Sequence, residues 1–294
     1  MNPAKRLIRG ALSALGYDIH RVPDRLDKAL YERLYSEDIL KNRRFYNIGA
    51  GAFSHPYWTN VDHDSEWYAA NRARTLAGIE YDLFSLQPLP IDSDSAELVY
   101  TSHTIEHVHN AAAQNMFNEA HRILKPGGIL RVTAPDIDLE YRAYKANDRD
   151  FFFWIDMYSI PENWKAIKIV KPMSEASTAQ IFLAHVATSL STLHSDGAPH
   201  RVDDAELSRL FDELGYEGAL DHLCAQCPIE IQRKYPGNHM NWWNKNKVMA
   251  MLRQAGFSDI YPSGYGQSYS PVLRNVALFD NTYTPVSLYV EARK

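Results

Sequence analysis

The sequence predicts an α/β protein in which helices flank a mostly parallel sheet, and three observations favour this class. Short apolar runs alternate with helical patterns from Arg44 to Asp138, which is typical of parallel strands joined by helical crossovers. The first run leads into two glycines in "YNIGAG", and the next two end in Asp62 and Asp82. The 294 residues are enough for a sizeable core in one large domain or two smaller ones.

Five strands are expected in the first half of the chain, at 45–48, 59–62, 78–83, 96–100 and 128–134. A helix precedes the fifth strand, because Met116, Phe117, Ala120, Ile123 and Leu124 fall on one helical face. The Pro-Gly-Gly sequence that follows is expected to end this helix.

The C-terminal part is expected to complete the sheet. "NKVMAMLRQAGFSDIY" predicts a helix that ends at Gly256 and a strand after it, and "PVSLYVEARK" predicts the last strand. Between about residues 137 and 246 the pattern changes, with aromatic clusters such as "FFFWIDMY" and "NHMNWW". We therefore divide the chain into an N-terminal helical segment (1–43), a core (44–138), an inserted helical, aromatic-rich region (139–246) and a C-terminal helix with strands (247–294).

Charge and cysteine content narrow the classes of partner. A formal net charge of -5 provides no basic field that would attract nucleic acid, so a nucleic-acid partner is not expected. Cys224 and Cys227 form a lone CxxC without a second ligand pair, and we interpret them as ordinary thiols of a reducing, cytoplasmic compartment. The sequence is also compatible with a homo-oligomer.

The N-terminal stretch 4–15 combines basic and apolar residues at helical spacing. No apolar run approaches the roughly 18 residues that a membrane span needs, and Arg9 interrupts this one. The apolar face could rest on a membrane surface as a peripheral contact. We expect it instead to pack on the body of the protein.

The glycines and acidic residues predict a ligand site. In an open parallel sheet the ligand lies at the carboxyl ends of the strands, where Gly49, Gly51, Asp62 and Asp82 all fall. Glycines let the backbone approach a ligand, and a carboxylate can accept both hydrogens of a ribose diol. A plain tight turn would also explain the glycines. The dinucleotide motif is incomplete because Ser54 replaces its third small residue, which disfavours a pyrophosphate-containing cofactor.

Three motifs in order resemble one family. "YNIGAGAFSHPYWTNVDHD", "YDLFSLQPLPIDSDSAELVYTSHTIEHV" and "EAHRILKPGGILRVTAPD" look like the class I S-adenosylmethionine-dependent methyltransferases, in particular type 11-like bacterial members that modify glycans and small molecules. The resemblance covers about 45–138, and the terminal helix and strands also fit. It implies a Rossmann-like, doubly wound sheet of seven strands with the last strand antiparallel, and S-adenosylmethionine as cofactor.

The resemblance also implies roles for single residues. Gly49 and Gly51 would line the methionine portion of the cofactor, Asp62 would bind the ribose hydroxyls, and Asp82 with Leu83 would frame the adenine. Ser102 and His103 would flank the sulfonium. Many members carry an acidic residue where this chain has Asn47, which could orient the loop or bind the methionine amine through water.

The string "HTIEH" leaves three readings open. His103, Glu106 and His107 would share a face if a helix starts here, and such a trio could hold a divalent metal. The string also matches the H-x-x-E-H pattern of zinc peptidases, although its position after a buried strand disfavours that activity. We favour a third reading without metal, in which Glu106 and His107 cap the helix and line the pocket.

Transfer of a methyl group requires mainly that the acceptor atom is positioned in line with the sulfonium and that water is excluded. A hydroxyl acceptor benefits from a general base, for which histidine is the commonest choice. The candidates are His107, His194, His200 and His239, with His107, His239 and His194 as the catalytic set. Aromatic residues near His239 offer flat faces for a sugar or another ring, or else fill a core.

The expected activity is therefore S-adenosylmethionine-dependent methylation, with oxygen as the favoured acceptor. "LGYDIHRV" resembles the leader of methyltransferases that accompany bacterial surface-polysaccharide synthesis, which favours a sugar hydroxyl in a surface glycan or its precursor. A small metabolite such as a phenol or polyketide is the alternative acceptor. A protein that binds the cofactor without catalysis is the alternative from a non-enzyme class.

Overall fold

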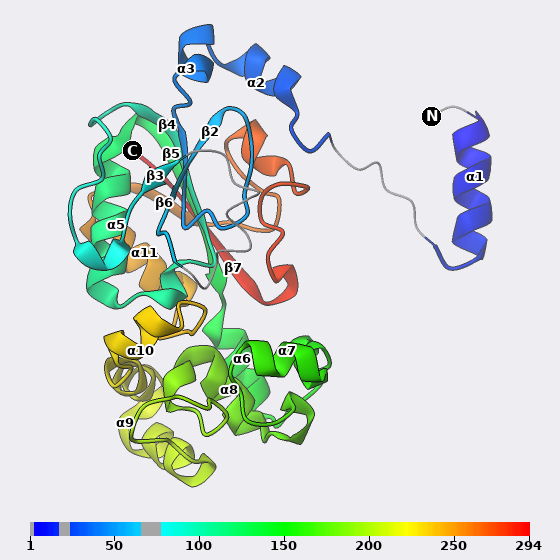
Figure 1. Cartoon of the computed structure of the whole chain (residues 1–294). Coiled ribbons are helices and arrows are strands. Elements are labelled where there is room, and N and C mark those ends of the chain that lie inside the picture. The colour runs from blue at the N-terminus through cyan, green and yellow to red at the C-terminus, as the bar shows by residue number, and fades with distance from the viewer. Residues whose placement is uncertain (1–2, 18–23, 66–77) are drawn as a thin grey trace.

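The computed structural model describes residues 3–17, 24–65 and 78–294, and a seven-stranded sheet lies at its centre (Figure 1). The strands are β1 (Phe45–Ile48), β2 (Trp58–Asp62), β3 (Ile79–Glu80), β4 (Ala96–Ser102), β5 (Leu124–Pro135), β6 (Asp259–Pro262) and β7 (Ser287–Arg293). Their order is β3-β2-β1-β4-β5-β7-β6. The first five pair in parallel, and β7 is antiparallel to both of its neighbours. The expected doubly wound sheet with an antiparallel last strand is confirmed.

Two strand boundaries differ from the prediction. β3 has only two residues, because Asp82 accepts a hydrogen bond from the amide of Phe84 and starts a short 3-10 helix at Leu83–Ser85. β5 begins at Leu124, so the Pro-Gly-Gly sequence does not separate helix from strand as predicted. The last residue of the chain explains this, since Gly127 N donates to Lys294 O and Lys294 N donates to Gly128 O.

The core helices α5 (Asn110–Ile123) and α11 (Lys245–Gln254) pack against each other. The helix start of α5 is fixed by His109, whose Nδ1 accepts a hydrogen bond of 3.0 Å from Ala112 N. Their apolar faces join the strands in one cluster of buried residues that includes Phe117, Val132 and Val290. Burial of these faces holds the carboxyl ends of β1 and β4 in fixed positions.

Of the N-terminal helices, α2 (Lys28–Leu34) packs on the sheet and α1 (Pro3–Ala14) does not. α2 packs through Tyr31, whose hydroxyl accepts a 2.7 Å hydrogen bond from Trp58 Nε1, and α3 (Glu37–Lys41) follows it. α1 stands apart from the body in Figure 1. Leu7 and Leu15 are 76% and 71% exposed, so the expectation that this face packs on the protein is wrong for the described side chains. Among the described residues, no helix is long and apolar enough to cross a bilayer.

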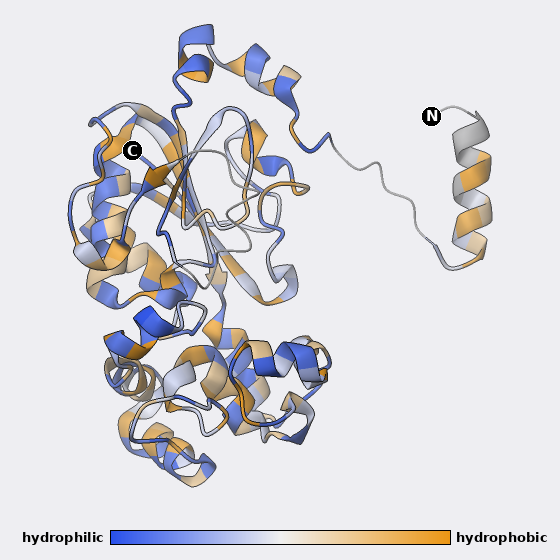
Figure 2. Cartoon of the chain, in the orientation of Figure 1, coloured by the Kyte–Doolittle hydropathy of each residue, from blue (hydrophilic) through white to orange (hydrophobic). Residues whose placement is uncertain are grey.

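The segment between β5 and α11 forms its own helical layer below the sheet in Figure 1. Its helices are α6 (Ile137–Lys145), α7 (Pro161–Ala166), α8 (Thr178–Val186), α9 (Asp204–Ala225) and α10 (Ile229–Lys234). They enclose a separate cluster of buried apolar residues, and α8 is buried along nearly all of its length. α10 is coloured mainly as hydrophilic in Figure 2. We keep 139–246 as the predicted extent of this insertion.

The insertion leaves and rejoins the core at one point. Ile137 N donates a 2.9 Å hydrogen bond to Trp243 O, and Asn244 Nδ2 donates to Asp138 Oδ1 at 3.1 Å. The two ends of the insertion are therefore bonded to each other beside the carboxyl end of β5.

Candidate active site

A cavity of about 690 Å³ opens where β1, β2 and β4 end. Its lining includes all eight cofactor-binding residues predicted from the sequence, namely Asn47, Gly49, Gly51, Asp62, Asp82, Leu83, Ser102 and His103, and also His107. The insertion contributes Gln232, Arg233 and Pro236, and the C-terminal part contributes Asn281 and Thr282. The cavity thus lies between the sheet and the segments that cover its carboxyl edge.

The two glycines of the first turn are required for different reasons. Gly49 has φ +70°, and a Cβ there would lie 2.1 Å from Thr104 Oγ1, so the close approach of Thr104 excludes any side chain. Gly51 has φ +51°, and a Cβ there would meet no described atom within 4 Å. Gly49 thus joins two loops, while Gly51 leaves free space beside the cavity. Thr104 was missed from the sequence, because nothing near it indicates contact with a residue 55 positions earlier.

Asp62 ends β2 with its carboxylate directed at the same turn. Its Oδ2 accepts a hydrogen bond of 2.6 Å from Gly51 N, and its Oδ1 accepts one of 2.8 Å from His63 N. Burial raises the pKa of Asp62 from its ordinary value, although both amides act in the opposite direction. Each carboxylate oxygen has a second lone pair, which leaves capacity for a diol.

Asn47 supplies an acceptor that the protein leaves unused. The residue is 3% exposed, and its Oδ1 finds no hydrogen-bond partner in the described parts of the chain. Buried polar atoms are nearly always paired, so an orphan acceptor in a cavity wall indicates a ligand donor. An amine such as that of S-adenosylmethionine supplies such a donor, and the residues present fit this cofactor.

Asp82 is already engaged at both oxygens. Oδ1 accepts a 2.8 Å hydrogen bond from Phe84 N, and Oδ2 pairs with Arg233 Nη2 at 3.0 Å. The Arg233 guanidinium also lies 5.3 Å from the centre of the Phe84 ring. This arginine belongs to α10, so the insertion contacts the predicted adenine end of the cavity. No sequence pattern links α10 to Asp82, which explains why Arg233 was not predicted.

The string "HTIEH" does not form the expected helix. His103 has φ +51° and precedes a 3-10 helix that contains only Ile105–His107. Its Nε2 lies 2.8 Å from Ser287 Oγ, and its Nδ1 lies 3.2 Å from Glu106 Oε1. The helix on which a shared face and the zinc-peptidase pattern depend is therefore not formed, although the rings of His103 and His107 both lie near Glu106 Oε1. Ser102 lies beside this segment and bonds Thr133.

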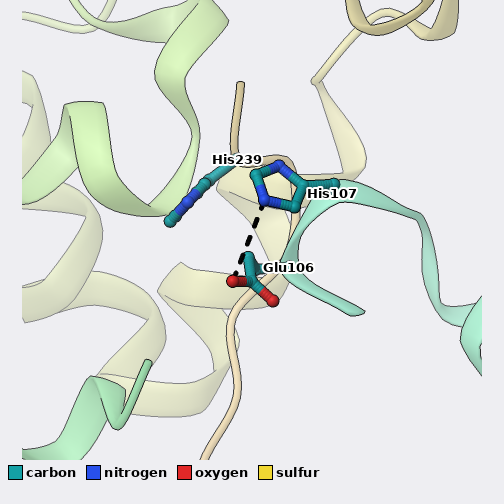
Figure 3. A group of neighbouring side chains, drawn as sticks. All are labelled: Glu106, His107 and His239. Atoms are coloured by element: carbon teal, nitrogen blue, oxygen red, sulfur yellow. Dashed lines mark ion pairs between the residues drawn. The ribbon is translucent and has the colours of Figure 1, made fainter. Parts of the chain in front are cut away.

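His239 comes from the insertion and lies beside Glu106 and His107 (Figure 3). The rings of His107 and His239 are 4.8 Å apart between centroids. His107 Nε2 lies 3.8 Å from Glu106 Oε1. One ligand atom from each of these three residues lies within 4.8 Å of the others, so a metal ion could be held here. His239 takes the place that the sequence assigned to His103.

The buried ionisable groups of this cluster shift one another's pKa values. Burial alone would raise the pKa of Glu106, but His103 and His107 hold it below its ordinary value. Burial, with His185 and His107 nearby, lowers the pKa of His239 well below its usual range. Burial would likewise lower the pKa of His185, but its pairing with Glu140 at 2.8 Å raises it. A charged carboxylate thus faces a neutral imidazole of His239.

Two histidine candidates lie elsewhere. His194 is buried, its Nδ1 accepts a hydrogen bond from Asp196 N, and its ring packs 5.1 Å from that of Tyr235. His200 pairs with Glu206 at 3.0 Å. Neither is among the described residues that line the cavity, and so the structure does not bring His194 together with His107 and His239.

Residues 49–132 match the family model of the methyltransferase domain. No curated protein matches the chain. Solved structures similar to it include an S-adenosylmethionine-dependent methyltransferase from Thermotoga maritima, described as a possible histamine N-methyltransferase. The two sequences are 15% identical, the TM-score is 0.37, and the match covers 85% of this chain and 82% of the other. A second, from Mesorhizobium loti, has 14% identity, TM-score 0.40 and coverage of 92% and 99%. A third, from Archaeoglobus fulgidus, has 11% identity, TM-score 0.39 and coverage of 91% and 92%.

Proposed function

We propose that the chain is a class I, S-adenosylmethionine-dependent methyltransferase that methylates an oxygen atom of a sugar, and the match of residues 49–132 to the methyltransferase domain supports the family. The favoured acceptor is a hydroxyl group in a bacterial surface glycan or its precursor. The observation that carries the choice of oxygen is the position of His107, which lines the cavity and whose Nε2 lies 3.8 Å from Glu106 Oε1, beyond hydrogen-bond distance. A hydroxyl needs such a proton acceptor because its own pKa is far above neutrality.

The cofactor is proposed to lie along the strand ends. Asp62 would bind the ribose hydroxyls, and Gly51 would face the methionine portion, where no described atom fills the space. Asn47 Oδ1 would accept a hydrogen from the methionine amine. Leu83 would contact the adenine, with Asp82 beside it. When bound, the cofactor supplies an activated methyl group, and the protein has to position the acceptor and exclude water.

His107 is oriented to accept the acceptor's proton. Its Nδ1 lies 2.9 Å from Asn238 O and must donate to that carbonyl, so the lone pair of the neutral ring is at Nε2. The ring of His239 packs against the ring of His107, and its own Nδ1 lies 2.7 Å from His185 O. We propose His107 as the general base and His239 as the residue that supports its position.

The lining contributed by the insertion and the C-terminal part suits a polyhydroxylated acceptor. Gln232, Asn281 and Thr282 provide donors and acceptors, and Arg233 provides a fixed cation at the rim. The resemblance of "LGYDIHRV" to polysaccharide-associated methyltransferases supports a glycan. A phenol or polyketide remains the alternative acceptor. We place the activity in the cytoplasm, because the unpaired thiols of Cys224 and Cys227 suit a reducing compartment.

The first test is calorimetric titration with S-adenosylmethionine, S-adenosylhomocysteine and NAD. Micromolar binding of the two sulfur compounds and none of NAD is expected. Transfer of radioactive methyl to lipid-linked glycan precursors, purified polysaccharide and a panel of phenols then identifies the acceptor. Label in phenols alone would replace the glycan by a small metabolite, and cofactor binding without transfer to any acceptor would favour a non-catalytic protein.

A further inference from the structure

The Glu106 carboxylate is costly for the protein to bury. The residue is 1% exposed, and neither of its carboxylate oxygens accepts a well-aligned hydrogen bond within the described residues, although His103 Nδ1 forms an ion-pair contact with Oε1. Burial of a charged group without hydrogen bonds is strongly unfavourable unless another charge compensates it. The nearest polar groups are ring nitrogens, His103 Nδ1 at 3.2 Å and His107 Nε2 at 3.8 Å. The carboxylate therefore faces positions that protons or a cation must fill.

The two neighbouring histidines are fixed in the form that ligates metals. His107 Nδ1 donates to Asn238 O at 2.9 Å, and His239 Nδ1 donates to His185 O at 2.7 Å. In a neutral imidazole the other nitrogen, Nε2, then carries a lone pair. Metal-bound histidines are usually held in this way, with the second ring nitrogen donating to a carbonyl or carboxylate.

The loop that carries His239 is held on both sides of the cluster. His239 N donates to Thr188 Oγ1 at 2.8 Å, and Thr188 N donates back to His239 O at 2.9 Å. Met240 N donates to Glu106 O at 2.9 Å. The insertion and the core are thus bonded at this point, and the three side chains are brought together before any ligand arrives.

We propose that Glu106, His107 and His239 bind one divalent transition-metal ion, of the zinc or iron class, through one carboxylate and two Nε2 atoms. Two imidazoles and one carboxylate suit these ions, whereas magnesium and calcium prefer oxygen ligands. A dication also compensates the buried charge of Glu106. Three protein ligands leave coordination positions open, as in catalytic sites.

The role of the metal ion in methyl transfer rests on the proposed function, whereas the test of metal binding does not. His107 lines the cavity, so an ion on its Nε2 would lie beside the acceptor and lower the pKa of a hydroxyl bound to it. The ion would then take over from the imidazole as the group that activates the hydroxyl. Without the ion, Nε2 of His107 stays free as the base proposed above.

The test uses the full chain without an affinity tag, stripped with a chelator and titrated with Co²⁺ while visible absorption is recorded. One equivalent of Co²⁺ with absorption bands typical of a nitrogen and oxygen ligand set is expected, and Zn²⁺ should displace it. Glu106→Gln and His239→Ala should each weaken Co²⁺ binding by at least about 100-fold. His200→Ala, which removes a histidine outside the cavity, should leave it unchanged. Thermal unfolding of each variant checks that it is folded.

Two results would overturn the metal site: a stripped, folded protein that takes up no stoichiometric Co²⁺, or uptake that folded Glu106→Gln and His239→Ala retain. S-adenosylmethionine binding is measured in the same samples by calorimetry. Cofactor binding without Co²⁺ binding rejects the metal site alone. Co²⁺ binding without cofactor binding rejects the proposed function alone.

Discussion

The carboxylate of Asp62 accepts a 2.6 Å hydrogen bond from the backbone amide of Gly51, so the end of β2 is tied to the turn that follows β1. The same carboxylate is held by His63 N at 2.8 Å. These bonds orient the carboxylate without using all of its lone pairs. The ligand-binding geometry at this edge of the sheet is therefore present before a ligand binds.

Asp62→Ala should weaken S-adenosylmethionine binding by at least about 10-fold, because a charged group that bonds a diol contributes about 1.5–3 kcal/mol. Calorimetry measures the affinity, and thermal unfolding should show a folded protein, since burial already raises the pKa of Asp62 and makes its charge unfavourable for the apoprotein. Glu213→Ala, on the exposed side of α9, serves as the control. A folded Asp62→Ala protein with wild-type affinity would remove the ribose assignment.

His107→Ala should lower turnover by about 10²–10⁴-fold, the usual contribution of a general base, and should change cofactor affinity much less. His239→Ala should also lower turnover, because its ring supports that of His107 at a centroid distance of 4.8 Å. Single-turnover rates at saturating cofactor give the comparison. Unchanged rates in both variants would exclude this pair as the acceptor-activating group.

Arg233→Ala should increase the dissociation rate of S-adenosylmethionine several-fold, because it removes the cation that pairs with Asp82 at the cavity rim. The free energy of unfolding should fall by at most about 1 kcal/mol, since Arg233 is half exposed and such ion pairs are weak. Stopped-flow measurement of cofactor release tests the first effect and urea unfolding the second. Arg233→Lys keeps the charge but not the planar group over Phe84, and should be intermediate. Release at the wild-type rate from Arg233→Ala would mean that α10 does not retain the cofactor.

Asp280→Asn should destabilise the fold by about 3–5 kcal/mol, because it leaves the fully buried Arg131 without its closest counter-charge. Arg131 Nη2 lies 2.6 Å from Asp280 Oδ2, and both side chains are fully buried. Asp259→Asn is the matched control, since its partner Arg293 is exposed at the surface, and it should cost less than about 1 kcal/mol. Urea unfolding of the two variants and the wild type gives the difference. Equal small losses in both would show that Glu291 alone compensates Arg131.

Lys247 gives a pH dependence. Burial lowers its pKa to about 8 from 10.5, so the folded protein disfavours the charged form. Below pH 8 Lys247 is charged in both the folded and the unfolded state, and the folded state bears the full cost of burying the charged ammonium group. As the pH rises from 8 to 10.5, the folded state loses this proton before the unfolded state does, and the cost of burial disappears. The wild type should therefore gain up to about 3 kcal/mol relative to Lys247→Met between pH 7 and pH 10.

Chemical denaturation of both proteins at the two pH values measures this gain, because other titrating groups cancel in the difference. The contacts of Lys247 with the rings of Trp242 and Trp243, at 4.1 Å and 4.6 Å, favour the charged form and oppose the effect. A constant difference between the two proteins would mean that these contacts fully offset the burial.

The sequence was informative where one local pattern determines the structure. β1 has the bounds that its apolar run predicted, and Gly51 and Asp62 could be placed because strand ends meet at one edge of a parallel sheet. The length of β3 could not be predicted, since the capping bond of Asp82 competes with strand pairing and leaves no mark in the apolar pattern.

The site was less predictable where distant segments meet. Arg233 contacts Asp82 from about 150 residues away, and His239 reaches Glu106 from about 130 residues away, through packing of the insertion on the core. Periodicity reports which face of a helix is buried but not which element covers it. The helical reading of "HTIEH" failed for a local reason, because His103 adopts a positive φ and turns the chain before a helix can start.

The hydrogen bond from Ile137 to Trp243 gives the segment between them a closed neck. Entry and exit share one narrow attachment, and even a doubling of the length of chain between them would add only about 0.6 kcal/mol of closure entropy. The segment also has its own apolar core. Such an attachment lets the segment keep its own packing while it presents Arg233 and His239 to the core.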